Sequence, residues 1–563
     1  MRTLFTAFLL LTATLCGAQE NTTPTYGEVI SRYEAIARSH AKTVRLIETG
    51  QTDAGLPLQL LIIDGSGRFD PEQSRAKGDL VWLIMNGIHP GEPCGIDASL
   101  RFAEKAAEKP KEGLVYAIIP VYNVGGALNR NRTSRANQNG PEEYGFRGNA
   151  KNYDLNRDFI KADTENTFAF AEIFHAWQPH FFIDTHTSNG ADYAPNITLI
   201  RTVPERLHPM QRTVFSREIM PEIFRRSEAA GEPLLPYVNT RGGVPETGIY
   251  AFNDLPRYST GYAALFGTMG IISEAHMLKP YPDRVQATLT LLETLESVLS
   301  ERRENLVALK KAAESATAAA KEFPTAFRLT DEASTVEFSG FRADTLPSKV
   351  TGLPRLRYNR NKPFTEKVPY YGTFEAERFF TLPAAFIIPQ SQKEVIARLE
   401  ANGIAFERLE KDEVREVTAR YIDTYETVNG PYEGHYLHHN TSAFGKKVSV
   451  QFRAGDVVVP CNQKGNRYLA HVFDPESPDS FFNWNFFDAF LMRKEYFSDY
   501  LFEDTAAEIL KRNTMLAKKF EEKKQEDPDF AADSRAQLEF IYKHSKYSEP
   551  EFMRLPIFET DHF

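Results

Sequence analysis

Residues 79–100, DLVWLIMNGIHPGEPCGIDASL, hold the pattern from which the fold can be predicted. Leu80–Met85 is an apolar run with the length of a buried strand. Asn86-Gly87 is a turn signal that ends this strand, and a helical pattern follows. His89 and Glu92 therefore lie in a loop between a strand and a helix, which is where open α/β sheets bind their ligands.

His89 and Glu92 are side chains of the kind that bind a borderline metal such as zinc. A third ligand is expected at another strand end, and residues 181–188, FFIDTHTS, are an apolar run in which His186 lies near the end. We expect His89, Glu92 and His186 to hold one zinc ion. The alternative is that His89 is a turn residue and His186 an ordinary polar residue.

Two further motifs make the pattern specific. Residues 153–159, YDLNRDF, lie between the ligand segments, and residues 270–277, GIISEAHM, form an apolar run that reaches Glu274. In their order and approximate spacing, the four motifs resemble the zinc carboxypeptidase family (carboxypeptidase A-like metallopeptidases) over about residues 25–320. The resemblance implies an α/β fold with a mixed, mostly parallel sheet and helices on both faces.

The resemblance also implies a role for each matching residue. Asp154 would orient His89. Asn156 and Arg157 would bind the terminal carboxylate of a substrate, because the planar fork of arginine meets a carboxylate through two hydrogen bonds. Glu274 would take a proton from the attacking water and pass it to the leaving amine, as general base and acid.

An arginine that stabilises the oxyanion is expected in the loop before Asn156, which is rich in Gly, Asn and Arg. Arg147 is favoured, because its distance from Asn156 resembles that in many bacterial family members. Other members have this arginine earlier in the loop. The rivals are Arg130, Arg132 and Arg135.

The resemblance also implies a mobile tyrosine that covers the substrate, shortly before Glu274. Tyr258 is favoured over Tyr250 and Tyr262, and Arg257 beside it could add a second contact to an anion. His276 is a second polar residue near Glu274 that could line the cleft without binding the metal.

The N-terminus has the pattern of a signal peptide over residues 1–18. Arg2 is followed by an apolar run and then by Cys16-Gly17-Ala18, with cleavage expected after Ala18. The run is too short for a membrane anchor, so the protein is expected to be exported to the periplasm or the extracellular space. Later in the chain, no apolar run is long enough for a membrane span.

Length and composition predict a large globular protein. The chain has 563 residues, a formal net charge of −10 and a pI near 5.8, so nucleic acid is not expected as a partner. We expect a catalytic domain over residues 24–323. Cys94 and Cys461 remain after cleavage, and the fold is not expected to depend on a disulfide.

Residues 325–563 are expected to form a C-terminal α+β, β-rich region with a helical tail. Turn signals at Asn429-Gly430, Gly445-Lys446 and Gly455-Asp456 predict several short strands. Residues 481–487 are rich in aromatics, which favours core over a ligand platform. No motif assigns chemistry to this region.

The sequence therefore predicts an exported zinc peptidase, by resemblance a carboxypeptidase, acting on a peptide or a peptidoglycan-derived peptide. One alternative is an amidohydrolase of cell-wall peptides or N-acyl amino acids on the same fold. Another is a non-catalytic binding protein with a degenerate peptidase domain. The sequence does not determine the oligomeric state.

Overall fold

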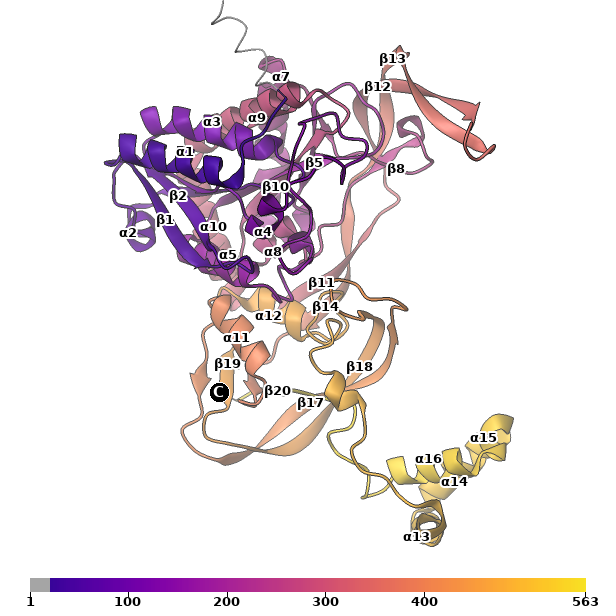
Figure 1. Ribbon diagram of the computed structural model, residues 1–563. Helices are drawn as coiled ribbons and strands as arrows, with labels where there is room; N and C mark the ends of the chain where they lie inside the picture. The colour runs from indigo at the N-terminus through magenta and orange to yellow at the C-terminus, as the bar shows by residue number, and fades with distance from the viewer. Residues whose placement is uncertain (1–20, 563) are drawn as a thin grey trace, which may run out of the picture.

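The computed structural model describes residues 21–562, so the predicted signal peptide lies outside the described residues (Figure 1). The largest sheet has eight strands in the order β1-β2-β4-β3-β5-β10-β6-β7. Their bounds are β1 Val44–Gln51, β2 Pro57–Asp64, β3 Leu80–Met85, β4 Leu114–Ile119, β5 Phe181–Ser188, β6 Ile197–Arg201, β7 Leu234–Pro236 and β10 Met269–His276.

The sheet is mixed and mostly parallel, as predicted. Strands β4, β3, β5 and β10 run parallel to one another, and β6 is parallel to β7. The antiparallel pairs are β1 with β2, β2 with β4, and β6 with β10. Because β3, β5 and β10 are adjacent and parallel, the residues at their carboxyl ends meet at one edge of the sheet.

Helices cover both faces of this sheet, which confirms the predicted fold class. The helices are α1 Tyr26–Ser39, α2 Pro71–Lys77, α3 Cys94–Glu108, α4 Val124–Leu128, α5 Glu165–Trp177, α6 Pro209–Val214, α7 Met220–Ala229, α8 Ser259–Leu265, α9 Tyr281–Glu301 and α10 Arg303–Ala319. Tyr33 of α1, Phe102 of α3 and Leu292 of α9 belong to the core on one face. Phe170 of α5 and Tyr262 of α8 belong to the core on the other.

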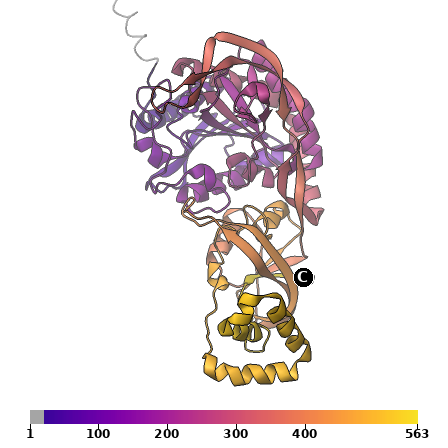
Figure 2. The ribbon, with the colours of Figure 1, turned by 90° about the vertical axis from the view of Figure 1, so that its right-hand side faces the viewer.

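A second, six-stranded sheet lies in the C-terminal region, in the order β16-β19-β15-β20-β17-β18. The elements of this region are β11 Glu322–Leu329, β14 Phe374–Thr381, β15 Ala385–Ile388, α11 Lys393–Ala401, β16 Glu407–Arg408, β17 Glu413–Thr427, β18 His438–Phe452, β19 Val457–Pro460, α12 Asn466–Phe473 and β20 Arg554–Thr560. Figure 2 shows this orange region directly below the violet N-terminal part.

The prediction of several short strands was wrong for β17 and β18. They form one long antiparallel hairpin, and Gly445 pairs with Arg420 inside it instead of making a turn. The turn signal at Asn429-Gly430 does fall in the connection between the two strands. A glycine in a strand can mark a close approach of neighbouring atoms, and here a Cβ on Gly445 would lie 3.0 Å from Thr418.

Strands β12 (Ser334–Pro347) and β13 (Pro354–Tyr371) form a ribbon that pairs with the N-terminal part of the chain. β13 is parallel to β9 (Ile249–Tyr250), which pairs with β8 (Asn239–Thr240). The ribbon therefore continues a small sheet that begins before residue 323. The domain limits at 323 and 325 remain a prediction.

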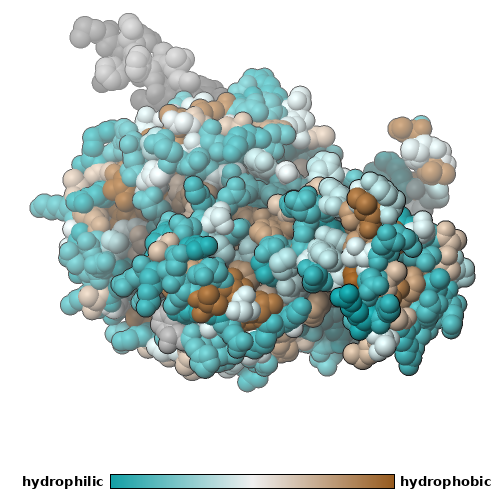
Figure 3. Space-filling view, turned by 90° about the horizontal axis from the view of Figure 1, so that it is seen from below, coloured by the Kyte–Doolittle hydropathy of each residue, from teal (hydrophilic) through white to brown (hydrophobic). Residues whose placement is uncertain are grey.

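The helical tail consists of α13 (Asp499–Arg512), α14 (Thr514–Glu526), α15 (Pro528–Ala532) and α16 (Ser534–Lys543) around a small core of their own. The chain then returns as β20 into the six-stranded sheet. Seen from below, the surface is mainly hydrophilic with small separate hydrophobic patches (Figure 3).

The aromatic segment at 481–487 is largely core, because Phe481, Phe482, Trp484 and Phe487 are buried. Both Cys94 and Cys461 are buried free thiols. Within residues 21–562, no helix combines the length and the apolar character that crossing a membrane requires.

Candidate metal centre and active site

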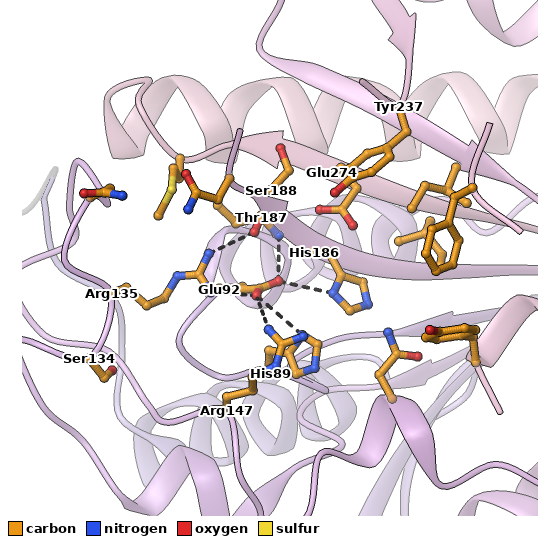
Figure 4. A pocket seen from close by; sticks show the side chains of 18 of the residues that line it. His89, Glu92, Ser134, Arg135, Arg147, His186, Thr187, Ser188, Tyr237 and Glu274 are labelled. Atoms are coloured by element: carbon orange, nitrogen blue, oxygen red, sulfur yellow. Dashed lines mark hydrogen bonds and ion pairs between the residues drawn. The ribbon is translucent and has the colours of Figure 1, made fainter. Parts of the chain in front are cut away.

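Three buried side chains converge at the edge where β3 and β5 end. His89 and Glu92 follow β3, and His186 lies in β5. One ligand atom from each lies within 4.8 Å of the ligand atoms of the other two. Figure 4 shows the two imidazoles and the carboxylate directed toward one another. The structure therefore brings together the three residues that the sequence predicted as ligands.

A carboxylate fixes the orientation of each imidazole. Nε2 of His89 lies 2.8 Å from Asp154 Oδ1, and Nε2 of His186 lies 2.9 Å from Asp184 Oδ2. Each ring therefore turns Nδ1 toward Glu92, at 3.4 Å for His89 and 3.2 Å for His186. Metal-binding histidines commonly use their second nitrogen in this way.

The donor set fits zinc. Nδ1 of His89 is buried and has no hydrogen-bond partner among the described residues, and two imidazoles with one glutamate are a recognised catalytic zinc set. Burial alone would lower the pKa of His186, but Asp184 and Glu92 outweigh it and hold this pKa well above its usual value. The surrounding carboxylates thus favour a positive charge at this position, which a metal cation can supply.

Glu274 lies beside the three predicted ligands. It is on β10, directly opposite His186 of β5 in the register of the two strands, and it lines the same cavity. Burial raises the pKa of Glu274 to about 7, and the negative charges of Glu92 and Asp184 act in the same direction. A carboxyl group with a pKa near neutrality can both accept and donate a proton.

Two arginines, Arg147 and Arg135, line the cavity next to Glu92. Nη1 of Arg147 lies 3.3 Å from Glu92 Oε1, and its Nε donates to Asp154 over 2.9 Å. Nη1 of Arg135 donates to the same Glu92 oxygen over 2.7 Å. Arg147 is the more accessible, with 46% of its side chain exposed against 16% for Arg135.

The other two arginine candidates do not line the cavity. Arg130 donates to the backbone oxygens of Thr23, Pro24 and Glu143, and Arg132 forms an exposed ion pair with Glu143. Both therefore stabilise the loop.

Asn156, Arg157 and Tyr258 line the side of the cavity next to Asp154. Asp154 is the N-cap of a short 3-10 helix, Leu155–Arg157, and its carboxylate accepts a hydrogen bond from the Asn156 backbone. The guanidinium of Arg157 lies 4.7 Å from the centre of the Tyr258 ring. One capped turn thus presents both residues that were predicted to bind a carboxylate.

The remaining candidates lie elsewhere. Tyr262 is buried in the core and donates to Asn402, and Tyr250 lies on β9 outside the cavity lining. The suggestion that Arg257 adds an anion contact in the cleft was wrong, because its guanidinium is buried and paired with Asp479. His276 does not line the cavity; it lies 3.3 Å from Asp192 and stacks on Tyr193.

Sequence reasoning missed Asp184 and Tyr237. Asp184 precedes His186 by two positions in a strand, and strand alternation, which puts such residues on one face, could have identified it. Tyr237 follows β7, and its side chain is directed toward Glu274 (Figure 4). No local pattern around Tyr237 signals this.

The cavity has a volume of about 420 Å³. Part of its lining is an apolar wall formed by Ile200, Phe252 and Ile272 with the ring of Tyr237. Ile200, Phe252 and Tyr237 also border a second, more apolar recess. The site therefore combines a polar floor with an apolar side.

This chain is similar to proteins described as carboxypeptidases. The sequence profile described as zinc carboxypeptidase matches residues 29–191. "Carboxypeptidase 2" of Trichophyton tonsurans is 25% identical over 434 residues, which cover 71% of this chain and 72% of that protein. "Carboxypeptidase 2" of Trichophyton rubrum is also 25% identical, over 436 residues and the same shares. A solved metallo-carboxypeptidase from Burkholderia cenocepacia is 14% identical with a TM-score of 0.36, covering 48% of this chain and 69% of that one.

Proposed function

We propose that this chain is an exported metallocarboxypeptidase of the zinc carboxypeptidase family, which removes residues from peptides with a free C-terminus; the matching family profile and the similar carboxypeptidases support this. The observation that carries the proposal is one cavity lined by His89, Glu92 and His186 together with Glu274 and a capped Asn156-Arg157 turn. This reaction needs an acid–base group, a metal site and residues that bind the terminal carboxylate. Asn156 and Arg157, the proposed residues of this last kind, are here called the carboxylate grip.

The proposed ligands of zinc are His89, Glu92 and His186. The chemistry that zinc supplies when bound is Lewis acidity toward the scissile carbonyl and a lowered pKa of water. Asp154 and Asp184 hold the two imidazoles in the orientation that leaves Nδ1 free. The site is thus prepared by residues that lie outside the ligand set.

Glu274 is the proposed general base and acid. It lies beside the proposed ligands, opposite His186, where its carboxylate can accept a proton from the attacking water and its acid form can then protonate the leaving amine. Arg147 is the proposed donor to the oxyanion, because its guanidinium borders the cavity and remains partly exposed. Arg135 is its rival; its closer contact with Glu92 supports a structural role instead.

Asn156 and Arg157 are proposed to bind the terminal carboxylate, and Tyr258 to cover it. Arg157 retains donors for a substrate, since the hydrogen bond that its side chain makes runs only from Nη1 to a backbone oxygen. The apolar wall of Ile200, Phe252 and Ile272 supports a preference for peptides that end in a large apolar residue.

The proposal is tested with the full chain loaded with zinc. Glu274→Gln is expected to keep its zinc, measured by metal analysis, and to lose about 10²- to 10⁴-fold in kcat, the usual contribution of an acid–base group. Glu228→Gln, an exposed change on α7, is the matched control. Retained turnover by Glu274→Gln would remove Glu274 from the mechanism.

The substrate class is tested with matched peptides. Peptides with a free C-terminus should be cut and their C-terminal amides should not, and peptides ending in Phe or Leu should be preferred to those ending in Lys or Glu. Cell-wall peptides and N-acyl amino acids belong in the same panel, because faster turnover of these would favour the amidohydrolase alternative. Equal cleavage of amidated and free peptides would contradict the assignment of Asn156 and Arg157 as the residues that bind the terminal carboxylate.

A further inference from the structure

A loop from the C-terminal region contacts the turn that presents Asn156 and Arg157. Residues 428–437, here called the hairpin tip, connect β17 to β18. Oε2 of Glu433 accepts a hydrogen bond from the backbone N–H of Asp154 over 2.8 Å. The two residues are 279 positions apart in the sequence, so this contact joins the C-terminal region to the catalytic site.

The close approach depends on local geometry in the hairpin tip. Glu433 and Gly434 both have positive φ, 49° and 82°. A Cβ on Gly434 would lie only 2.7 Å from the hydroxyl of Tyr153. The backbone here adopts the left-handed region that favours glycine, and Glu433 tolerates it, which brings its carboxylate to the backbone of the neighbouring segment.

Asp154 is the residue on which several groups of the site depend. Its carboxylate accepts from Nε2 of His89 over 2.8 Å, from Nε of Arg147 over 2.9 Å and from the backbone of Asn156 over 2.9 Å. A small shift of the Asp154 backbone would therefore move a proposed metal ligand and the carboxylate grip together.

Further contacts of the hairpin tip hold it against the catalytic part of the chain. His435 Nε2 lies 2.7 Å from Oδ2 of Asp163, a residue shortly after the Asn156-Arg157 turn in the chain. The ring of Tyr432 stacks on Trp484, and the guanidinium of Arg257 lies against both rings, 5.5 Å and 4.9 Å from their centres. Arg257 directly precedes Tyr258, so the hairpin tip also borders the segment with the proposed covering tyrosine.

We propose that Glu433 is a positioning residue of the active site: from the C-terminal region it fixes the backbone of Asp154, and so orients His89 and the Asn156-Arg157 turn. For the carboxylate grip, this inference rests on the function proposed above. It gives part of residues 325–563 a role in the reaction, although none of the hairpin tip lines the cavity. A purely structural contact would instead affect only stability.

The test uses zinc-loaded, full-length Glu433→Ala, Glu433→Gln and the control Glu416→Ala, which changes an exposed glutamate of β17 in the same hairpin. Two measurements are made for each variant: kinetics on a peptide with a free C-terminus, which give kcat and KM, and the rate of zinc release to a chelator. Glu433→Ala should raise KM about tenfold with kcat nearly unchanged, the size expected for loss of a hydrogen bond to a charged acceptor. It should also release zinc several times faster.

Glu433→Gln should restore most of both quantities, because its amide oxygen can accept the same hydrogen bond from Asp154. A rise in KM or in zinc release that glutamine reverses supports the proposal. If both quantities in Glu433→Ala stay within about twofold of the control, the proposal is overturned, even if the variant unfolds more easily.

Failure of the proposed function would look different. If the unaltered enzyme cuts amidated peptides as fast as free ones, the carboxylate grip is wrong whatever Glu433 does. Zinc release then decides on Glu433 alone, because that measurement depends on Asp154 and His89 and needs no substrate.

Discussion

At the scale of single residues, two carboxylates behind the proposed ligands hold the imidazoles of His89 and His186 in place. Asp184 is fully buried, lies 2.9 Å from Nε2 of His186 and accepts a second hydrogen bond from Ser259. Its negative charge raises the pKa of His186 and would equally favour a metal cation at Nδ1. The strength of metal binding should therefore follow the charge on Asp184.

Asp184→Asn should weaken zinc binding about 10- to 100-fold, the usual cost of changing a partner behind a ligand. Asparagine keeps the shape but removes the charge. The dissociation constant for zinc is measured by competition with a chelator of known affinity. Asp192→Asn is a matched control, because Asp192 pairs with His276, which does not line the cavity. Equal zinc affinity in the two variants would contradict the role of Asp184.

Motifs with regular spacing could be found from the sequence, whereas isolated contacts could not. His89 and Glu92 follow an apolar strand, and His186 and Glu274 lie near the ends of two others. Parallel strands bring these ends to one edge. Tyr237 reaches the cavity from a segment with no such signal. Which of several loop arginines enters the cavity depends on the path of the loop, and spacing alone does not determine that path.

At the scale of secondary structure elements, α3 packs closely on β5. Gly95, at the start of α3, faces Thr185, and a Cβ on Gly95 would lie 2.0 Å from Thr185 Oγ1 and 2.3 Å from its Cβ. Thr185 is β-branched and stiff about χ1, and it is next to His186. Glycine at this position therefore allows α3, which follows His89 and Glu92, to lie against β5, which holds His186.

Gly95→Ala should lower the free energy of unfolding by about 1–3 kcal/mol through overpacking, and it should weaken zinc binding because α3 and β5 must separate. Gly27→Ala on α1 is the control, since a Cβ there meets nothing within 4 Å; it should raise stability by up to about 1 kcal/mol. Both values come from urea unfolding of the zinc-loaded protein. If Gly95→Ala left the free energy of unfolding unchanged, α3 could shift away from β5 without cost.

The strand run that ends at a turn signal was predicted well. The apolar run Leu80–Met85 has the same limits in the structure, as β3, because Asn86-Gly87 ends it. The long hairpin β17–β18 was not predicted, because Gly445 belongs to a turn signal in the sequence although it pairs within β18. The same strand also contains Asn440, whose φ is positive. Sequence signals for turns describe backbone freedom, and pairing with a partner strand can override them.

At the scale of the whole molecule, Asp163 lies where the catalytic part and the C-terminal region meet. Its carboxylate accepts from Lys161 over 2.7 Å, contacts His435 of the hairpin tip at 2.7 Å and accepts from Arg398 of α11 over 3.2 Å. These partners come from segments far apart in the chain, and no motif marks them. Sequence reasoning assigned no role to residues 325–563, because such contacts arise only when the chain is folded.

The charge on Asp163 should stabilise the folded protein in a pH-dependent way. Burial opposes ionisation, but the hydrogen bond with His435 and the charge of Lys161 outweigh it and lower the pKa of Asp163 from 3.8 to about 2. A carboxyl group with a lowered folded pKa contributes stability that is complete above the unfolded pKa and is lost as the pH falls through the folded one. The contribution should be complete above about pH 4 and mostly lost near pH 2.

Asp163→Asn should therefore cost roughly 2 kcal/mol of unfolding free energy at pH 7, from a shift of about two pKa units, and much less as the pH approaches 2. Urea unfolding at pH 7, 5 and 3 measures the difference between the variant and the unaltered protein. Asp423→Asn, at an exposed position of β17, should show no such difference. A cost for Asp163→Asn that is the same at pH 7, 5 and 3 would mean that its packing, and not its charge, joins the two parts of the molecule.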